Sequence, residues 1–207
     1  MTASPAIDAL LAPASAGAAS TRPSSLEAEK VRAAQDGDMR AFEWIVNQHE
    51  ERLFGFCCRW LRCTQDAREA CQDAFVRAWQ SLPEFEGRAR LSTWLYQIAL
   101  NLCRDRAKTR GARQRDNTLA LEEVREAPLC PQSTPDENAA LQSELQKLHR
   151  GLAVLPEKLR MVLMLTAFEG LSHEECAEVL NCSVRGVEGR VYRARQMLLD
   201  WWNNEER

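Results

Sequence analysis

The stretch that decides the fold is residues 172–195, SHEECAEVLNCSVRGVEGRVYRAR. It contains two helical segments separated by Asn181, a residue type that tolerates the left-handed conformation of a tight turn. Ala177 supplies the small side chain that two closely crossing helices require. The apolar side chains expected to face the core are Cys176, Leu180, Cys182 and Val187. This pattern predicts a helix-turn-helix, whose second helix is suited to the major groove of DNA.

Each of these two helices has a start signal. Ser172 and Glu175 are three residues apart and predict a capping box on the first helix. Ser183 is expected to cap the second helix. The predicted outer face of the second helix carries Arg185, Glu188, Arg190 and Arg193. Such side chains would contact base edges or phosphates, although an ordinary helical hairpin with a charged face fits the same pattern.

The residues before this segment continue the helical periodicity. Leucines line one predicted face at Leu141, Leu145, Leu148, Leu152 and Leu155. Pro156 is expected in the first turn of the next helix, which runs to Phe168, and Gly170 is expected to end it. With the helix-turn-helix, these helices predict a domain over residues 138–204.

A second helical domain is predicted over residues 26–112. Asp38 is expected to cap a long helix, in which apolar residues recur at three- and four-residue steps over 42–61. A second helix is predicted over 66–81, because the Leu-Pro pair that follows disfavours further helix.

A third helix of this domain follows the loop 84–90, with Ser92 or Thr93 as its expected cap. Its predicted apolar face carries Leu91, Trp94, Leu95, Ile98, Ala99 and Leu102. Trp94 is therefore expected in the core. Tyr96 lies off this face and is the better candidate for stacking on an unpaired base.

The remaining segments are predicted to lack regular structure. Residues 1–25 are rich in Ala, Ser and Pro with almost no charge, which is typical of a disordered tail. Residues 113–137 lose the helical periodicity and contain three prolines, which predicts a flexible linker. The predicted fold is therefore all-α, with two small helical domains joined by that linker.

The charge distribution favours a nucleic-acid partner more than the formal net charge of −3 does. Residues 101–115 hold six cations and one acid, and residues 183–195 hold four cations and one acid. The intervening residues 116–144 hold seven acids and one base. A phosphate backbone is attracted to local patches of positive charge, so these two basic blocks favour a nucleic-acid partner. The first block is also compatible with a solvated helix end.

The sequence gives no indication of a membrane segment or a signal peptide. The longest apolar run, 161–167, is far shorter than the ~20 residues of a membrane helix. No basic segment precedes the apolar residues of the N-terminus. We therefore expect a cytoplasmic protein that is not inserted in a membrane.

Eight cysteines occur without a CxxC pair, so neither a disulfide scaffold nor a structural zinc site is favoured. Two clusters leave metal or redox sensing as an alternative to apolar packing. They are His173 with Cys176 and Cys182, and His49 with Cys57, Cys58 and Cys63. No catalytic triad, paired-carboxylate site or phosphate loop is evident, so we expect neither an enzyme nor a bound cofactor.

Two stretches resemble the extracytoplasmic-function (ECF) group of sigma-70 family RNA polymerase sigma factors. The motifs LPEKLR at 155–160, EGLSHEE at 169–175 and RAR at 193–195 are similar to region 4 of that family. Those similar to region 2 are Asp66-Ala67, Gln72, Phe75, Ala78-Trp79, Phe85-Glu86-Gly87, STWLYQIA at 92–99 and Asn101. Both sets occur in the family's order with a linker between them.

The resemblance implies a transcription initiation factor whose partners are core RNA polymerase, promoter DNA and a membrane-linked anti-sigma factor. The implied polymerase-binding residues are Asp66, Glu69, Gln72, Asp73, Phe75 and Trp79. Those implied to melt the −10 element and hold its single strand are Phe85, Arg88, Arg90, Tyr96, Asn101, Arg104, Arg106, Lys108 and Arg110. Those implied to read the −35 duplex are Ser183, Arg185, Gly186, Glu188, Arg190 and Arg193.

Some residues depart from the family pattern. Arg68 stands where the family usually has an acid, so the polymerase contact is expected to differ there. Gly186, Glu188 and Gly189 stand where the family often has Thr, Lys and Ser, so the −35 sequence cannot be copied from another member. A dimeric repressor or activator, or an enzyme with a DNA-binding appendage, would also use a helix-turn-helix.

Overall fold

The computed structural model describes residues 25–61, 63–116, 147–148 and 150–205, with the backbone alone described at 110–116. Every regular element in these ranges is helical, which confirms the all-α prediction. The described residues divide into an N-terminal unit, residues 25–116, and a C-terminal unit, residues 147–205. Residues 1–24 of the expected tail 1–25 and most of the expected linker lie outside the described residues, whereas Ser25, the last residue of that tail, begins a helix.

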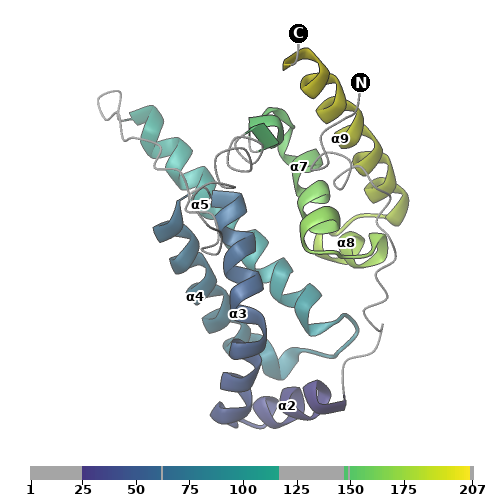
Figure 1. Cartoon of the computed structure of the whole chain (residues 1–207). Coiled ribbons are helices and arrows are strands. Elements are labelled where there is room, and N and C mark those ends of the chain that lie inside the picture. The colour runs from purple at the N-terminus through teal and green to yellow at the C-terminus, as the bar shows by residue number, and fades with distance from the viewer. Residues whose placement is uncertain (1–24, 62, 117–146, 149, 206–207) are drawn as a thin grey trace, which may run out of the picture. The chain divides into compact units, whose positions relative to one another are not determined.

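The N-terminal unit contains four α-helices and a short 3-10 turn among its described residues. They are α2 (Ser25–Gln35), α3 (Met39–Leu61), α4 (Thr64–Ser81), η1 (Leu82–Glu84) and α5 (Leu91–Asp116). Figure 1 shows α3, α4 and α5 side by side, with α2 lying across the beginning of α3. α5 continues four residues into the range that we expected to be linker.

Alanines on α4 allow the two neighbouring helices to approach closely. Ala67, Ala70, Ala74 and Ala78 are all fully buried, at the three- and four-residue spacing of one helix face. Larger side chains fill the space around this face, among them Ile45, Leu53, Phe56, Leu82, Leu95 and Leu100. The core of the unit therefore lies where α3 and α5 meet the small face of α4.

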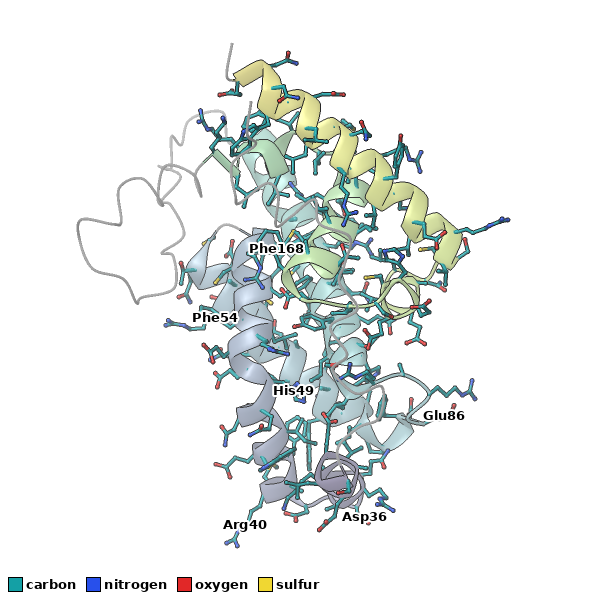
Figure 2. The ribbon with its side chains drawn as sticks, turned by 45° about the vertical axis from the view of Figure 1, so that its right-hand side comes forward. Asp36, Arg40, His49, Phe54, Glu86 and Phe168 are labelled. Atoms are coloured by element: carbon teal, nitrogen blue, oxygen red, sulfur yellow. The ribbon has the colours of Figure 1, made fainter. Side chains whose placement is uncertain are left out.

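The predicted cap of α3 is confirmed, but α2 was not predicted as a separate helix. Arg40 N donates to Asp38 Oδ1 at 2.9 Å, and Gly37, with φ +94°, makes the turn between the helices. α2 is further held to α3 by His49 Nε2, which lies 3.3 Å from Glu27 Oε1 (Figure 2 labels His49). Burial lowers the pKa of His49, and the Glu27 carboxylate opposes this shift.

α5 begins one residue before the caps that we expected for it. Trp94 N donates to Arg90 O at 3.0 Å, so the helix is already established ahead of Ser92. Thr93 is 1% exposed, and its Oγ1 has no hydrogen-bond partner among the described residues. Thr93 therefore fills core space and caps nothing.

The described C-terminal unit consists of helical residues 147–148 and 150–154, followed by four named elements. These are α7 (Glu157–Leu163), η2 (Met164–Phe168), α8 (His173–Val179) and α9 (Val184–Glu205). A buried cluster joins them, made of Leu148, Leu152, Leu155, Leu163, Ala194 and Leu198. Gly151 lies against α9, where a Cβ atom would come within 2.7 Å of Leu198 Cδ1.

The helix that starts after Pro156 ends in a π-turn. η2 continues α7 with wider hydrogen bonding, as shown by Glu169 N donating to Met164 O at 3.3 Å. Met164, Leu165 and Thr166 are buried, whereas Ala167 is exposed. Gly170 then adopts φ +68°, as expected for the residue that ends this helix.

Candidate nucleic-acid and protein interfaces

The helix-turn-helix of residues 172–195 forms as the sequence predicts. Ser172 Oγ accepts from Glu175 N at 3.2 Å, and Ser172 N donates to Glu175 Oε2 at 2.8 Å, which completes the capping box. Asn181 has φ +47°, and Cys182 N donates to Ala177 O at 3.0 Å across the turn. These contacts fix the start of α9 relative to α8 within this unit.

The beginning of α9 presents a polar face to solvent. Ser183 Oγ accepts from Gly186 N at 3.1 Å, which confirms Ser183 as the cap. Val187, Val191 and Ala194 face the core. The exposed side chains on the opposite side include Arg185, Glu188 and Arg193, as predicted.

Tyr192 was missed by the sequence analysis, although it is 66% exposed on the same face. Its spacing of four residues from Glu188 and seven from Arg185 would have placed it there. Aromatic residues in a helix are usually expected to face the core of the protein, which is why Tyr192 was not predicted on the exposed face.

Arg190 differs from the outward position that we expected. It is half-buried, and its Nη1 donates to Cys182 Sγ at 3.3 Å. The guanidinium is therefore directed toward the turn of the motif. Arg193 stays exposed, with Nε donating to Gly189 O at 3.0 Å on its own helix.

In the N-terminal unit, one side chain of α2 holds the loop between η1 and α5. Gln35 Nε2 donates to Leu82 O at 3.0 Å and to Phe85 O at 2.8 Å. Both amide hydrogens of Gln35 are thus used on backbone carbonyls of this loop. Sequence alone does not predict this role of Gln35, because its partners lie 47 and 50 residues further along the chain.

The aromatic residues near this loop are arranged differently from our expectation. Tyr96 is only 5% exposed, and its ring centroid lies 5.4 Å from that of Phe56 in an edge-on contact. Trp94 is half-buried and pairs with Phe85, at 4.9 Å between centroids. The placement of Tyr96 off the apolar face was wrong, because α5 packs against both α3 and α4 and so buries a wider face.

The charged residues around the loop and along α5 fall into two groups. Arg88, Asn101 and Lys108 are exposed, and Arg88 pairs with Glu86, which lies at the edge of the loop in Figure 2. Arg90, Arg104 and Arg106 are half-buried. The side chain of Arg110 lies outside the described residues, although its backbone belongs to α5.

The predicted polymerase-binding residues occupy α4, but not all are exposed. Gln72 and Asp73 are exposed, and Asp66 and Glu69 are half-buried. Phe75 is 7% exposed. Trp79 is half-buried, with its ring 4.9 Å from that of Phe42.

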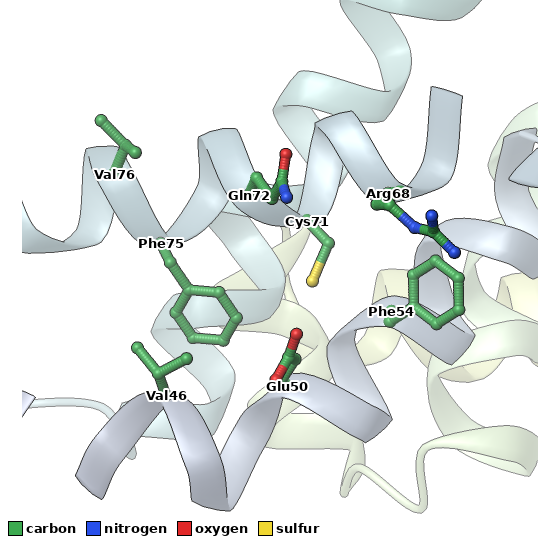
Figure 3. A pocket seen from close by; sticks show the side chains of 8 residues that line it. All are labelled: Val46, Glu50, Phe54, Arg68, Cys71, Gln72, Phe75 and Val76. Atoms are coloured by element: carbon green, nitrogen blue, oxygen red, sulfur yellow. The ribbon is translucent and has the colours of Figure 1, made fainter. Parts of the chain in front are cut away.

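A mainly apolar pocket lies beside these α4 residues (Figure 3). Its volume is about 480 Å³, and its lining residues are Val46, Glu50, Phe54, Arg68, Cys71, Gln72, Phe75 and Val76. Val46 and Phe75 face each other across it, and Arg68 lies beside the ring of Phe54. Val76 is 56% exposed at its edge, so the surface combines apolar contact area with polar residues.

The cysteines are packed mainly as small apolar side chains. Burial raises the pKa of Cys71 and of Cys176 to about 12 in each case. In the described part of the chain, no group of three or more His, Cys, Asp or Glu side chains is placed to hold a metal ion. Cys130 lies outside the described residues.

We expect these two buried thiols to react very slowly with alkylating reagents in the native protein. A pKa of about 12, against an ordinary value of 9.0, lowers the thiolate fraction at pH 8 by roughly 1,000-fold. Alkylation at pH 8 followed by peptide mass spectrometry would measure this, with half-buried Cys63 and Cys182 as internal controls. Rapid labelling of Cys71 or Cys176 before the controls would contradict this packing and favour a sensing role.

None of the helices in the described ranges combines the length and the apolar character that a bilayer crossing requires.

Comparison with protein families identifies both units. The family model described as Sigma-70 region 2 matches residues 45–113, and the model described as Sigma-70, region 4 matches residues 145–198. The RNA polymerase sigma-H factor of Pseudomonas aeruginosa is 35% identical over 173 residues, covering 81% of this chain and 89% of that protein. The ECF RNA polymerase sigma-E factor of Escherichia coli K12 is 30% identical over 172 residues, covering 81% and 90%.

Solved structures show the same fold. CnrH, in a complex with the cytosolic domain of CnrY, is 28% identical, with a TM-score of 0.65 over 87% of this chain and 99% of that one. The sigma factor RpoE of Bartonella quintana, in a complex with the anti-sigma factor NepR, has a TM-score of 0.65 at 23% identity, covering 80% of this chain and 98% of that one. The latter comparison shows likeness of fold alone.

Proposed function

This chain belongs to the ECF group of the sigma-70 family of RNA polymerase sigma factors, and on that premise we propose which of its surfaces performs each step of initiation. The protein is a transcription initiation factor that directs core RNA polymerase to promoters, and not an enzyme. We assign region 2 to residues 26–112 and region 4 to residues 138–204, with residues 113–137 as the linker. The observation that carries the assignment of surfaces is the capped, exposed polar face at the start of α9.

The −35 duplex is bound by that face. Ser183, Arg185 and Gly186 lie at the N-terminal end of α9, where a recognition helix contacts base edges, and Glu188 and Arg193 follow on the same side. Glu188 would accept from a cytosine amino group. We add Tyr192 to this set because it is exposed between them. Arg190 reaches DNA only if it leaves Cys182.

The −10 element is opened and held by the loop after η1 together with α5. Arg88, Arg90 and Phe85 belong to the loop that Gln35 holds. Asn101, Arg104, Lys108 and Arg110 follow along α5 and supply polar and cationic contacts to the displaced strand. Buried Tyr96 supports this surface from the core, and the Phe85–Trp94 pair replaces it as the aromatic group at the loop.

Core polymerase is bound by α4. Asp66, Glu69, Gln72 and Asp73 offer polar contacts, and Phe75 with Val76 offers apolar area at the pocket of Figure 3. Trp79 supports the helix through its packing on Phe42. Arg68, at the edge of the same pocket, adds a cation to this surface.

An anti-sigma factor controls the protein by covering these surfaces. This proposal draws on the two similar structures described above, in which CnrH is bound to the cytosolic domain of CnrY and the sigma factor RpoE is bound to the anti-sigma factor NepR. We further propose that the protein acts in the cytoplasm, where polymerase and promoter DNA are, and that its anti-sigma factor is linked to the membrane.

Run-off transcription tests the proposed function. The reaction contains purified core polymerase, the full chain and fragmented genomic DNA of the source organism. We expect discrete transcripts that depend on the protein, with start sites that align on two promoter elements. Arg185→Ala should reduce them by roughly 10- to 100-fold, the scale of one base contact. Arg150→Ala, an exposed arginine outside α9, is the matched control and should have little effect.

A different outcome of these experiments would indicate another class of DNA-binding protein. Specific duplex binding by the protein alone, without any protein-dependent transcript, would refute a sigma factor and indicate a repressor or activator. The purified protein would be treated with reductant and chelator, and both removed, before either reaction, so that an oxidised or metal-bound state is not mistaken for inactivity.

A further inference from the structure

Arg106 links two helices that we have assigned to different partners. It projects from α5, and its Nη1 donates to Glu69 Oε2 at 2.9 Å while its Nη2 donates to Asp73 Oδ2 at 2.6 Å. Both acids belong to α4. The family resemblance implied that Arg106 contacts the −10 element, and that Glu69 and Asp73 contact polymerase.

The two carboxylates would repel each other without this guanidinium. Glu69 and Asp73 are four residues apart on one helix, which brings like charges onto the same face. Arg106 supplies a separate terminal nitrogen to each acid, and Gln65 Nε2 donates to the other oxygen of Glu69 at 2.9 Å. The hydrogen bonds from Gln65 and Arg106 lower the pKa of Glu69, because they stabilise its ionised carboxylate.

The exposure of the three side chains shows which of them a partner can reach. Glu69 and Asp73 keep 46% and 51% of their side-chain surface exposed, whereas Arg106 keeps 27%. A cationic group of a protein partner can therefore approach the carboxylates from outside. A DNA phosphate approaching Arg106 would have to displace two charge-assisted hydrogen bonds and would meet two negative charges.

We infer that Arg106 is a positioning residue for polymerase binding, which holds the Glu69 and Asp73 carboxylates in place on α4, and that it is not a DNA contact. This inference rests on the proposed function of α4. It separates Arg106 from Lys108, which lies on the same helix but is exposed and remains assigned to DNA.

Two measurements on the full chain test the inference. The first is the affinity for purified core polymerase, measured by fluorescence competition. Arg106→Ala should weaken it by roughly tenfold, the scale of one hydrogen bond to a charged group. Arg106→Lys should recover part of the loss, because one ammonium cannot bridge both acids as the planar guanidinium does.

The second measurement is the salt dependence of promoter binding, with polymerase saturated by each variant. Arg106→Ala should leave the slope of log K against log salt unchanged. Lys108→Ala, the matched control, should reduce the magnitude of the slope by about one, as expected for the loss of one phosphate contact.

Three results would overturn the inference. They are an unchanged polymerase affinity in Arg106→Ala, a tighter affinity, and a slope reduced as in Lys108→Ala. Thermal unfolding of each variant checks its fold. If Arg106→Ala is unfolded at the assay temperature, the affinity of Arg106→Lys for core polymerase is compared with that of the wild type. Equal affinities would refute the inference. Failure of the wild-type protein to bind polymerase would instead refute the proposed function.

Discussion

Gln35→Glu is expected to impair promoter opening by more than tenfold while leaving the protein folded. The change keeps the shape of the side chain, but puts a carboxylate oxygen where Nε2 now donates to Leu82 O and Phe85 O. Two carbonyls would lose their donor and face a negative charge, which costs about 1–3 kcal/mol for each unsatisfied group. The loop that carries Phe85 and Arg88 would then no longer be held against α2.

The permanganate reactivity of the −10 thymines, in promoter DNA bound by the assembled holoenzyme, measures promoter opening. Thermal unfolding measures the stability of the protein. Gln35→Ala should be milder than Gln35→Glu, because water can enter the space and donate to the carbonyls. Gln80→Glu makes the same chemical change at an exposed position of α4 and should shift stability by less than about 0.5 kcal/mol. Equal opening by Gln35→Glu and the wild type would show that the loop does not need this contact.

Gly151→Ala is expected to destabilise the C-terminal unit, although alanine is the better helix former. The added Cβ would lie 2.7 Å from Leu198 Cδ1 and 2.9 Å from two ring atoms of Trp201. Leu198 is completely buried, in a protein interior whose close packing leaves few voids for a side chain to move into. Overpacking of this kind costs about 1–3 kcal/mol, which exceeds the gain of up to about 1 kcal/mol in helix propensity.

Gly189→Ala is the matched control for this change, because a Cβ there would meet nothing within 4 Å. It should stabilise the unit by about 0.4–1 kcal/mol. Differential scanning calorimetry should therefore show opposite shifts of the melting temperature, at about 4–8 °C per kcal/mol for a domain of this size. Stabilisation by both substitutions would mean that α9 moves away from Gly151 at little cost.

The parts of the fold that sequence predicts correctly are those specified by neighbouring residues. The Ser172–Glu175 capping box, the left-handed Asn181 and the Asp38 cap all depend on residues within a few positions of each other. Helix periodicity likewise predicts α3 and α4, because each has one clear buried face. The outward position of Arg185 follows from that same periodicity in α9.

The features that sequence did not predict depend on contacts between distant segments. Gln35 and Arg106 are ordinary surface residue types, and their roles arise only when partners 33 to 50 residues away are brought beside them. Tyr96 was misplaced because α5 is buried on two sides, which periodicity within a single helix does not reveal. α2 was missed because it is short and Ala34 is its one buried residue, so it has no recurring buried face.

The π-turn at Met164–Phe168 is a place where a relative could have one residue fewer without a change in its core. A π-turn closes its hydrogen bond over five residues, so it accommodates one residue more than an α-turn does. Ala167 is exposed, whereas Met164 and Leu165 point inward. A relative with a single-residue gap at this place would therefore keep the same core on both sides of the gap, and the gap would mark a local change of helix type.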